Sequence, residues 1–291
     1  MDGNGERELA AQETIIRITD QLRQVDGVKA IVLGGSRARG TGHALSDIDI
    51  GIYYEGGEGL DISGIRRVAS ILDDEQREDI ITEIGEWGPW INGGGWLKID
   101  GQPVDFLYRD IDQVSIVLEQ CIAGDIMIEY QPGHPHGFVN VVYAAEAALC
   151  NILWDPYGAV GTMKAKTVQY PSKMREGIVR RFWWEAGFSY EGAGKGIYKK
   201  DLSYVAGQLY RTISCLNQVL FAINETYWMN EKGAAAIVDS FPLAPHAYTK
   251  RVNEVISLIT EKPADLDNAM ATVGDLIRET DGWIRRAGGA S

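Results

Sequence analysis

The stretch VKAIVLGGSRARGTGHALSDIDIGIYY, residues 28–54, decides the fold of the first half of this chain. Val28–Leu33 is a short run of β-branched and apolar residues, and Asp47–Tyr54 alternates polar and apolar residues until a pair of glycines stops it. Both patterns are typical of β-strands. Because the residues between them begin with Gly34 and Gly35, the sequence predicts two strands joined by a glycine-rich loop.

Further elements of the same domain surround these two strands. Helical spacing of apolar residues predicts a helix over Glu6–Val25 and another over Ile62–Leu72. Trp96–Ile99 and Pro103–Tyr108 flank an Asp-Gly dipeptide, which suits a two-residue turn. We therefore expect a β-hairpin here and an α/β character for the first half.

The second half has a different pattern. Beyond about Gly137 the strand signals fade, and long helical patterns follow over Val139–Trp154, Leu202–Ile223, Tyr248–Ile259 and Leu266–Ile284. Proline and glycine residues punctuate the chain shortly after Trp154. We expect an α+β protein, with a mixed β-sheet flanked by helices in a catalytic domain over residues 1–160 and an α-helical bundle domain over residues 161–291.

Composition narrows the environment and the partners. A chain of 291 residues with 45% hydrophobic residues can bury a sizeable core, and a net charge of −13 repels nucleic acid on average. No apolar stretch reaches the length of a membrane helix, the N-terminus does not resemble a signal peptide, and three scattered cysteines fit neither a disulfide framework nor a zinc site. We expect a cytoplasmic protein whose partner is a small molecule, without membrane or nucleic acid.

Three carboxylates form the most informative constellation. Strand alternation places Asp47 and Asp49 on one face of their strand, where the two like charges repel each other. Such a pair suits Mg²⁺, which prefers oxygen ligands and is usually held by carboxylates together with substrate phosphates. Asp105 lies between two apolar residues of the predicted hairpin, in a strand that could lie beside the first. The sequence therefore predicts that three acids converge on two magnesium ions.

The loop before these acids suits a triphosphate. Gly35 allows close approach of the backbone, Ser36 offers a hydroxyl, and Arg37 and Arg39 add positive charge. With the three acids, this arrangement suits in-line attack of a hydroxyl on the α-phosphorus of a nucleoside triphosphate. Asp105 would accept the proton of that hydroxyl or bind the nearer metal.

The ordered set Gly35-Ser36, Asp47-x-Asp49 and a later strand Asp105 resembles the signature of the DNA polymerase β-like nucleotidyltransferase superfamily. Within it, the chain is similar to the antibiotic nucleotidyltransferases, which adenylylate aminoglycosides or lincosamides with ATP and Mg²⁺. That likeness implies that Asp47 and Asp49 bind both metals, that Asp105 is the third ligand or the base, and that Ser36 holds the triphosphate.

The second half carries a weaker part of the likeness. The segment Asn230–Ala235, followed by Phe-Pro, is similar to the part of aminoglycoside 3''-type adenylyltransferases in which a helical-domain lysine contacts the triphosphate. Lys232 is thus expected to close the nucleotide site, together with Gly35, Ser36 and Arg39. Glu129 is an alternative general base to Asp105.

Two other functions stay open. The Gly-Ser-Arg-Ala-Arg-Gly loop also resembles nucleotidyltransferases of toxin–antitoxin systems, which modify a protein or a tRNA. A non-catalytic nucleotide-binding protein with this fold is a further alternative, although such proteins should lack one of the acids.

Several other residues have two interpretations each. His134 and His136 lack further ligands at metal-binding spacing and are interpreted as a rigid turn. The aromatic run Phe182–Trp184 could stack on a ring or belong to the core, and Arg180 and Arg181 could bind phosphate or form a solvated helix face.

Overall fold

The computed structural model describes residues 3–40 and 46–288, which form two compact units. The first unit comprises residues 1–119, 130–133 and 143–169, and the second comprises residues 120–129, 134–142 and 170–291. Each unit is therefore discontinuous in sequence, and two helices, α4 (Ile111–Ala123) and α5 (Val141–Leu149), have residues in both.

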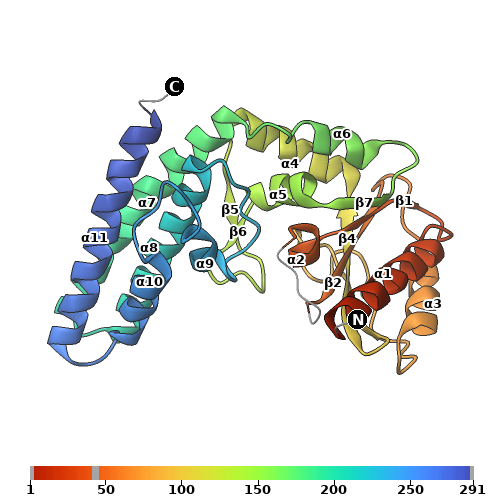
Figure 1. The fold of residues 1–291 in the computed structure, drawn as a ribbon, viewed down its shortest axis with the longest axis horizontal. Coiled ribbons are helices and arrows are strands. Elements are labelled where there is room, and N and C mark those ends of the chain that lie inside the picture. The colour runs from red at the N-terminus through yellow and green to blue at the C-terminus, as the bar shows by residue number, and fades with distance from the viewer. Residues whose placement is uncertain (1–2, 41–45, 289–291) are drawn as a thin grey trace. The chain divides into compact units, whose positions relative to one another are not determined.

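The first unit is built on a five-stranded mixed sheet with the order β3-β4-β2-β1-β7 (Figure 1). Its strands are β1 (Val28–Leu33), β2 (Ile48–Tyr54), β3 (Gly94–Ile99), β4 (Gln102–Asp110) and β7 (Asn151–Trp154). β2 and β4 are parallel, and the other neighbouring strands are antiparallel. Short helices α2 (Gly35–Ala38) and α6 (Ala159–Ala165) complete the unit.

Two helices, α1 (Gly3–Leu22) and α3 (Ile62–Leu72), pack on one face of this sheet and contact each other (Figure 1). Their apolar stripes and the inward-facing residues of the strands form one buried core, which includes Ile15, Ile18, Leu22, Ile65, Ile48, Ile50, Val104 and Phe106. Since successive strand residues point to opposite faces, the residues between these strand positions lie on the other face of the sheet.

The predicted β-hairpin is confirmed. Ile99 pairs with Gln102, and the two residues between them, Asp100 and Gly101, have φ angles of 51° and 76°. Positive φ at both central positions is the requirement of a type I′ turn, which Asp-Gly meets at low cost. The hairpin brings β4, and with it Asp105, back toward the centre of the sheet.

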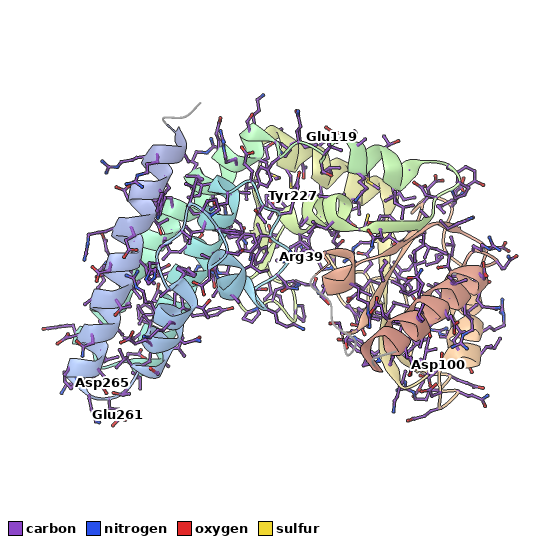
Figure 2. The ribbon with its side chains drawn as sticks, viewed as in Figure 1. Arg39, Asp100, Glu119, Tyr227, Glu261 and Asp265 are labelled. Atoms are coloured by element: carbon purple, nitrogen blue, oxygen red, sulfur yellow. The ribbon has the colours of Figure 1, made fainter. Side chains whose placement is uncertain are left out.

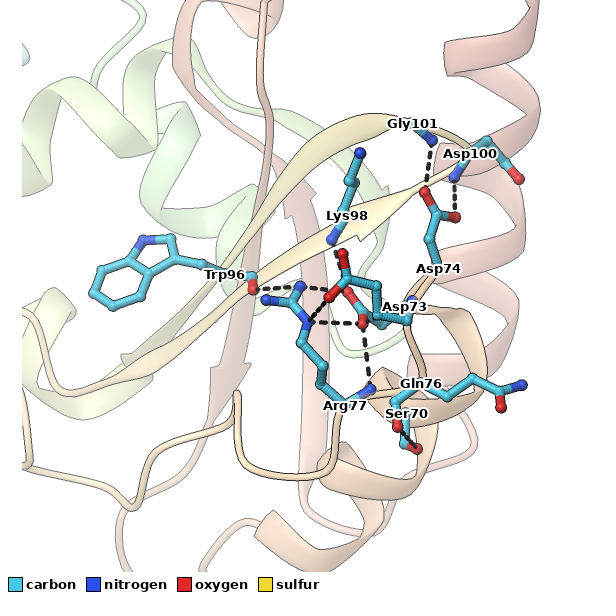
Figure 3. A network of polar contacts seen from close by, with 10 residues as sticks. Ser70, Asp73, Asp74, Gln76, Arg77, Trp96, Lys98, Asp100 and Gly101 are labelled. Atoms are coloured by element: carbon cyan, nitrogen blue, oxygen red, sulfur yellow. Dashed lines mark hydrogen bonds and ion pairs between the residues drawn. The ribbon is translucent and has the colours of Figure 1, made fainter.

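A polar network ties the end of α3 to this hairpin (Figure 3). The buried Asp73 carboxylate accepts hydrogen bonds from the Arg77 guanidinium at 2.6 and 2.9 Å and from the Lys98 backbone N–H at 2.9 Å. Asp74 accepts the backbone N–H groups of Asp100 and Gly101, each at 2.8 Å. The hydrogen bond from Arg77 is the main cause of the lowered pKa of Asp73, so this carboxylate is held charged.

The second unit is mainly helical. Its helices are α7 (Ser172–Tyr198), α8 (Leu202–Ile223), α9 (Ala234–Val238), α10 (Tyr248–Ser257) and α11 (Pro263–Gly288). α7 and α8 make the most extensive helix–helix contact in the chain, and β5 (Ile128–Glu129) pairs with β6 (Phe138–Val139). No helix among residues 3–40 and 46–288 is long and apolar enough to cross a membrane.

The α+β class is confirmed, with one correction to the predicted elements. The helix predicted over Val139–Trp154 ends at Leu149, and Asn151–Trp154 forms strand β7 instead. Val32 pairs with Ile152 and Ile31 with Trp154, so the position beside β1 determines the structure of this segment. A short apolar run fits a helix or a strand equally well, and tertiary pairing decides between them.

Candidate active site

Asp49 and Asp105 lie side by side on the sheet. They are Cα partners on the adjacent parallel strands β2 and β4. The residues directly before and after each aspartate, Ile48 and Ile50 on β2 and Val104 and Phe106 on β4, point into the core. Both aspartates therefore point to the opposite face, where each is half-buried. Because neighbouring strands are about 4.8 Å apart, the two carboxylates are close enough to share one cation.

The glycine-rich loop begins directly beside this pair. The Gly34 N–H donates a 2.8 Å hydrogen bond to the carbonyl of Asp49, which extends the β1–β2 pairing by one residue. Gly35 then starts helix α2 with a φ of 62°. A Cβ atom at position 35 would lie 1.8 Å from Asp49 Oδ2, so the loop can pack against this carboxylate because residue 35 has no side chain.

The polar residues of the loop differ in their surroundings. Ser36 is exposed in α2, and Arg39 ends that helix (Figure 2), where burial lowers the pKa of its guanidinium from the usual value. Arg37 is nearly buried, and its guanidinium bonds the Ser46 carbonyl at 3.1 Å and the Glu8 carboxylate at 3.1 Å. Arg37 thus links α2 to the start of β2 and to α1, and Ser36 and Arg39 stay the predicted phosphate-binding residues of the loop.

Asp47 directly precedes β2 and is exposed. It lies two residues before Asp49, so the structure brings two of the three predicted acids into register and places the third next to them along the chain. The segment 41–45 that joins the loop to this position lies outside the described residues.

The residues fit magnesium that is bound together with a nucleotide. In the described part of the chain, no group of three or more His, Cys, Asp or Glu side chains could hold a metal ion. Mg²⁺ is usually bound by one or two carboxylates and completed by substrate phosphates and water. Asp49 and Asp105 supply two such carboxylates, and the loop beside them offers a place for phosphate.

Two candidate residues belong to the second unit. Lys232 is exposed just before α9, and Glu129 is exposed on β5. Glu231, the residue before Lys232, is held in place. Its carboxylate accepts a hydrogen bond from the backbone N–H of His136 at 3.2 Å and lies 3.3 Å from His134 Nδ1. The predicted roles of Lys232 and Glu129 stay predictions.

The sequence does not predict the contacts of Glu231 with the two histidines. Glu231 and His136 are 95 positions apart, so no local motif could reveal the contact. Within the turn before Phe138, His136 is buried while its neighbours are exposed or half-buried, and nothing in the local sequence distinguishes it.

Comparison with known proteins agrees with this geometry. Residues 13–121 match the family model described as "Nucleotidyltransferase domain". This match begins within α1 and includes the loop, Asp47, Asp49 and Asp105. No curated protein sequence matches the chain.

Among solved structures, the chain is similar to a nucleotidyltransferase-like protein from Exiguobacterium sibiricum 255-15, with 6% sequence identity and a TM-score of 0.42. The likeness covers 89% of this chain and 73% of that one. At this similarity it supports no conclusion about function. The family match and the sheet that carries the acids lead to one statement: residues 13–121 of this chain carry a nucleotidyltransferase domain.

Proposed function

We propose that this protein is a magnesium-dependent adenylyltransferase that transfers AMP from ATP to a hydroxyl group of a small molecule, such as an aminoglycoside or a lincosamide. The observation that carries the proposal is the register of Asp49 with Asp105 directly beside the loop that Gly35 opens. In this proposal, residues 1–160 form the catalytic domain, and residues 161–291 form a helical domain that binds the acceptor and completes the nucleotide site.

The loop would bind the triphosphate. Ser36 offers an exposed hydroxyl, and Arg39 contributes a positive charge at the end of α2. Asp49 and Asp47, with Asp105 as the third ligand or the base, would hold two Mg²⁺ ions together with the phosphates of the nucleotide. The ions would neutralise phosphate charge and lower the pKa of the attacking hydroxyl. Lys232 would add a further contact to the triphosphate from the helical domain.

The transfer forms one bond and breaks one. The acceptor oxygen attacks the α-phosphorus, the bond from that phosphorus to the bridging oxygen of the β-phosphate breaks, and pyrophosphate leaves. The proton of the hydroxyl passes to the carboxylate of Asp105, or to Glu129 in the alternative assignment. Since Asp105 lies half-buried on the sheet, it is held in a fixed position for this step.

Incubation of the protein with labelled ATP, Mg²⁺ and a panel of aminoglycosides and lincosamides tests the proposal. We expect pyrophosphate release that depends on one of these acceptors, and a loss of roughly 100-fold or more in the Asp49→Asn and Asp105→Asn variants. Asp112→Asn, at an exposed position at the start of α4, is the matched control and should keep full activity.

The same experiment separates the alternatives. Label that appears on a co-expressed protein or on tRNA would assign the enzyme to the toxin–antitoxin type. Nucleotide binding without transfer to any acceptor would favour a non-catalytic nucleotide-binding protein. Full activity in the Asp49→Asn variant would contradict the site assignment itself.

A further inference from the structure

A pocket lies within the second unit, between helix α7 and the segment 124–127 that follows α4. Its volume is about 540 Å³, within the range of roughly 300 to 1,000 Å³ that is usual for small-molecule sites. Five α7 residues at helical spacing line one wall: Gly177, Arg180, Arg181, Trp184 and Glu185. This spacing places all five on one face of the helix.

Two glycines set the width of this pocket. A Cβ atom at Gly177 would lie 2.4 Å from the Gly124 carbonyl oxygen, and one at Gly124, where φ is 92°, would lie 2.7 Å from the Lys173 carbonyl oxygen. Any side chain at either position would push the segment 124–127 away from α7. The close approach of the two walls is therefore built into the sequence.

The charges of the lining are unequally paired. Glu185 is 9% exposed and forms an ion pair with Arg211 of α8, so its charge is neutralised. Arg180 donates one long hydrogen bond of 3.5 Å to the Gly124 carbonyl, and in the described part of the chain neither Arg180 nor Arg181 forms an ion pair. Asp125 also lines the pocket, but the two guanidiniums outnumber its carboxylate.

This pairing differs from that of neighbouring arginines. Arg175, on the same helix, pairs with Glu225, and Arg211 pairs with Glu185. In a protein with a net charge of −13, carboxylates are abundant. Two guanidiniums that line one pocket and still lack a carboxylate partner provide planar donors for an anion from outside the chain.

An aromatic surface adjoins these donors. Trp184 is 67% exposed and stacks on Phe188, with ring centroids 5.2 Å apart and an interplanar angle of 19°. A large indole ring exposed at a pocket offers a flat apolar surface to a ligand. We infer that this pocket binds a small molecule that carries a phosphate or carboxylate group for Arg180 and Arg181 and a flat ring for Trp184.

Titration calorimetry with phenyl phosphate and benzoate tests this inference, with benzyl alcohol as the neutral probe. The full chain is used without ATP or Mg²⁺, so the outcome does not depend on the proposed transferase activity. We expect saturable binding of at least one anionic probe, and the stronger of the two identifies phosphate or carboxylate as the preferred group. Binding should weaken as salt is added.

Matched variants locate the binding. The double variant Arg180→Gln with Arg181→Gln should lower the affinity for the anionic probe by roughly 10-fold or more, because charge-assisted hydrogen bonds are lost. Lys195→Gln with Lys199→Gln removes the same charge from exposed positions at the end of the same helix and should change affinity less than about 2-fold. Trp184→Ala should lower the affinity for phenyl phosphate more than the affinity for inorganic phosphate.

Three results would overturn the inference. They are the failure of both anionic probes to bind, equal weakening by the two double variants, and binding of benzyl alcohol as tight as that of the anions. Thermal unfolding of each variant checks that the fold is kept. Since Arg180 and Arg181 are exposed, their replacement should leave the unfolding midpoint nearly unchanged.

Discussion

The carboxylate of Asp49 occupies the space that a side chain at position 35 would need. A Cβ atom built on Gly35 would lie 1.8 Å from Asp49 Oδ2 and 2.6 Å from its carboxyl carbon. The loop and the acid thus depend on each other: the glycine lets the backbone approach, and the acid is held beneath the loop that is proposed to bind phosphate.

The first prediction concerns Gly35→Ala. The new methyl group must displace the Asp49 carboxylate or the loop, and a shift of about 1 Å in a catalytic group can cost roughly 100-fold in rate. We expect a loss of this size in the transferase assay, with the unfolding midpoint lowered modestly. Steady-state kinetics and thermal unfolding of the variant measure the two effects.

Gly40→Ala is the matched control for this prediction. Gly40 has a positive φ of 76°, like Gly35 at 62°, but among the described residues no atom lies within 4 Å of a Cβ built at position 40. Alanine therefore brings similar backbone strain at both positions and a steric clash at position 35. Equal losses in the two variants would show that strain, and not contact with Asp49, explains the effect.

The second prediction concerns Asp73, which ties α3 to the β3–β4 hairpin. Its carboxylate is fully buried and accepts hydrogen bonds from Arg77 and Lys98, so Asp73→Asn should destabilise the protein by about 3 kcal/mol. Denaturant unfolding measures this loss. Asp74→Asn, in the same network but at an exposed position, should cost less.

The pH dependence of Asp73 follows from its lowered pKa. The hydrogen bond from Arg77 keeps the carboxylate charged in the folded protein, while in the unfolded chain its pKa is about 3.9. The stabilisation is therefore complete above about pH 4 and is lost as the pH falls further. In the Asp73→Asn variant this part of the acid dependence should be absent.

Much of the first unit could be predicted from the sequence. β1 and α3 have the predicted bounds, and the Asp-Gly turn follows from a local pattern. The strand of Asp105 lies beside β2, as the sequence allowed, but its parallel direction is seen only in the structure. These elements have strong local signals, namely strand alternation, helical periodicity and turn chemistry. The proximity of Asp49 and Asp105 could be expected because β4 is the second strand of the hairpin and has one edge available for pairing with β2.

The remaining features depend on contacts that sequence patterns do not encode. Strand β7 forms because β1 has an open neighbour position, and helix α7 was not predicted because several glycines interrupt its apolar stripe. The sequence allows Arg37 to be a source of positive charge for phosphate or a solvated surface residue, and the structure shows instead contacts with Glu8 and the Ser46 carbonyl. Side-chain partners far apart in the sequence decide each of these cases.

The third prediction concerns Lys232, which is exposed before α9 next to the anchored Glu231. If its ammonium group contacts the triphosphate, Lys232→Gln should raise the KM for ATP by roughly 10-fold, because a charge-assisted contact is lost. The KM for the acceptor should stay the same. Lys250→Gln, at an exposed position in α10, is the control, and an unchanged KM for ATP in Lys232→Gln would contradict the role.

The last prediction concerns the buried ring of His136, which is 5% exposed and packs against Phe182. Burial, with a further contribution from the Arg211 charge, lowers its pKa to about 4, and the nearby Glu231 opposes this shift. In the unfolded chain the pKa is about 6.5, so the unfolded state takes up the proton first. The free energy of unfolding should therefore be unaffected by this ring above about pH 6.5. It should fall by roughly 3 kcal/mol as the pH drops to about 4.

Thermal unfolding midpoints of the His136→Leu variant between pH 4 and 7.5 test whether this pH dependence of stability comes from the ring of His136. In the described part of the chain, neither ring nitrogen of His136 has a hydrogen-bond partner, so an apolar side chain of similar volume loses no polar contact of the ring. The variant should lose the dependence between pH 6.5 and 4 while the natural protein keeps it. His246→Gln, at an exposed position, should behave like the natural protein, and an unchanged pH profile in His136→Leu would place the titrating group elsewhere.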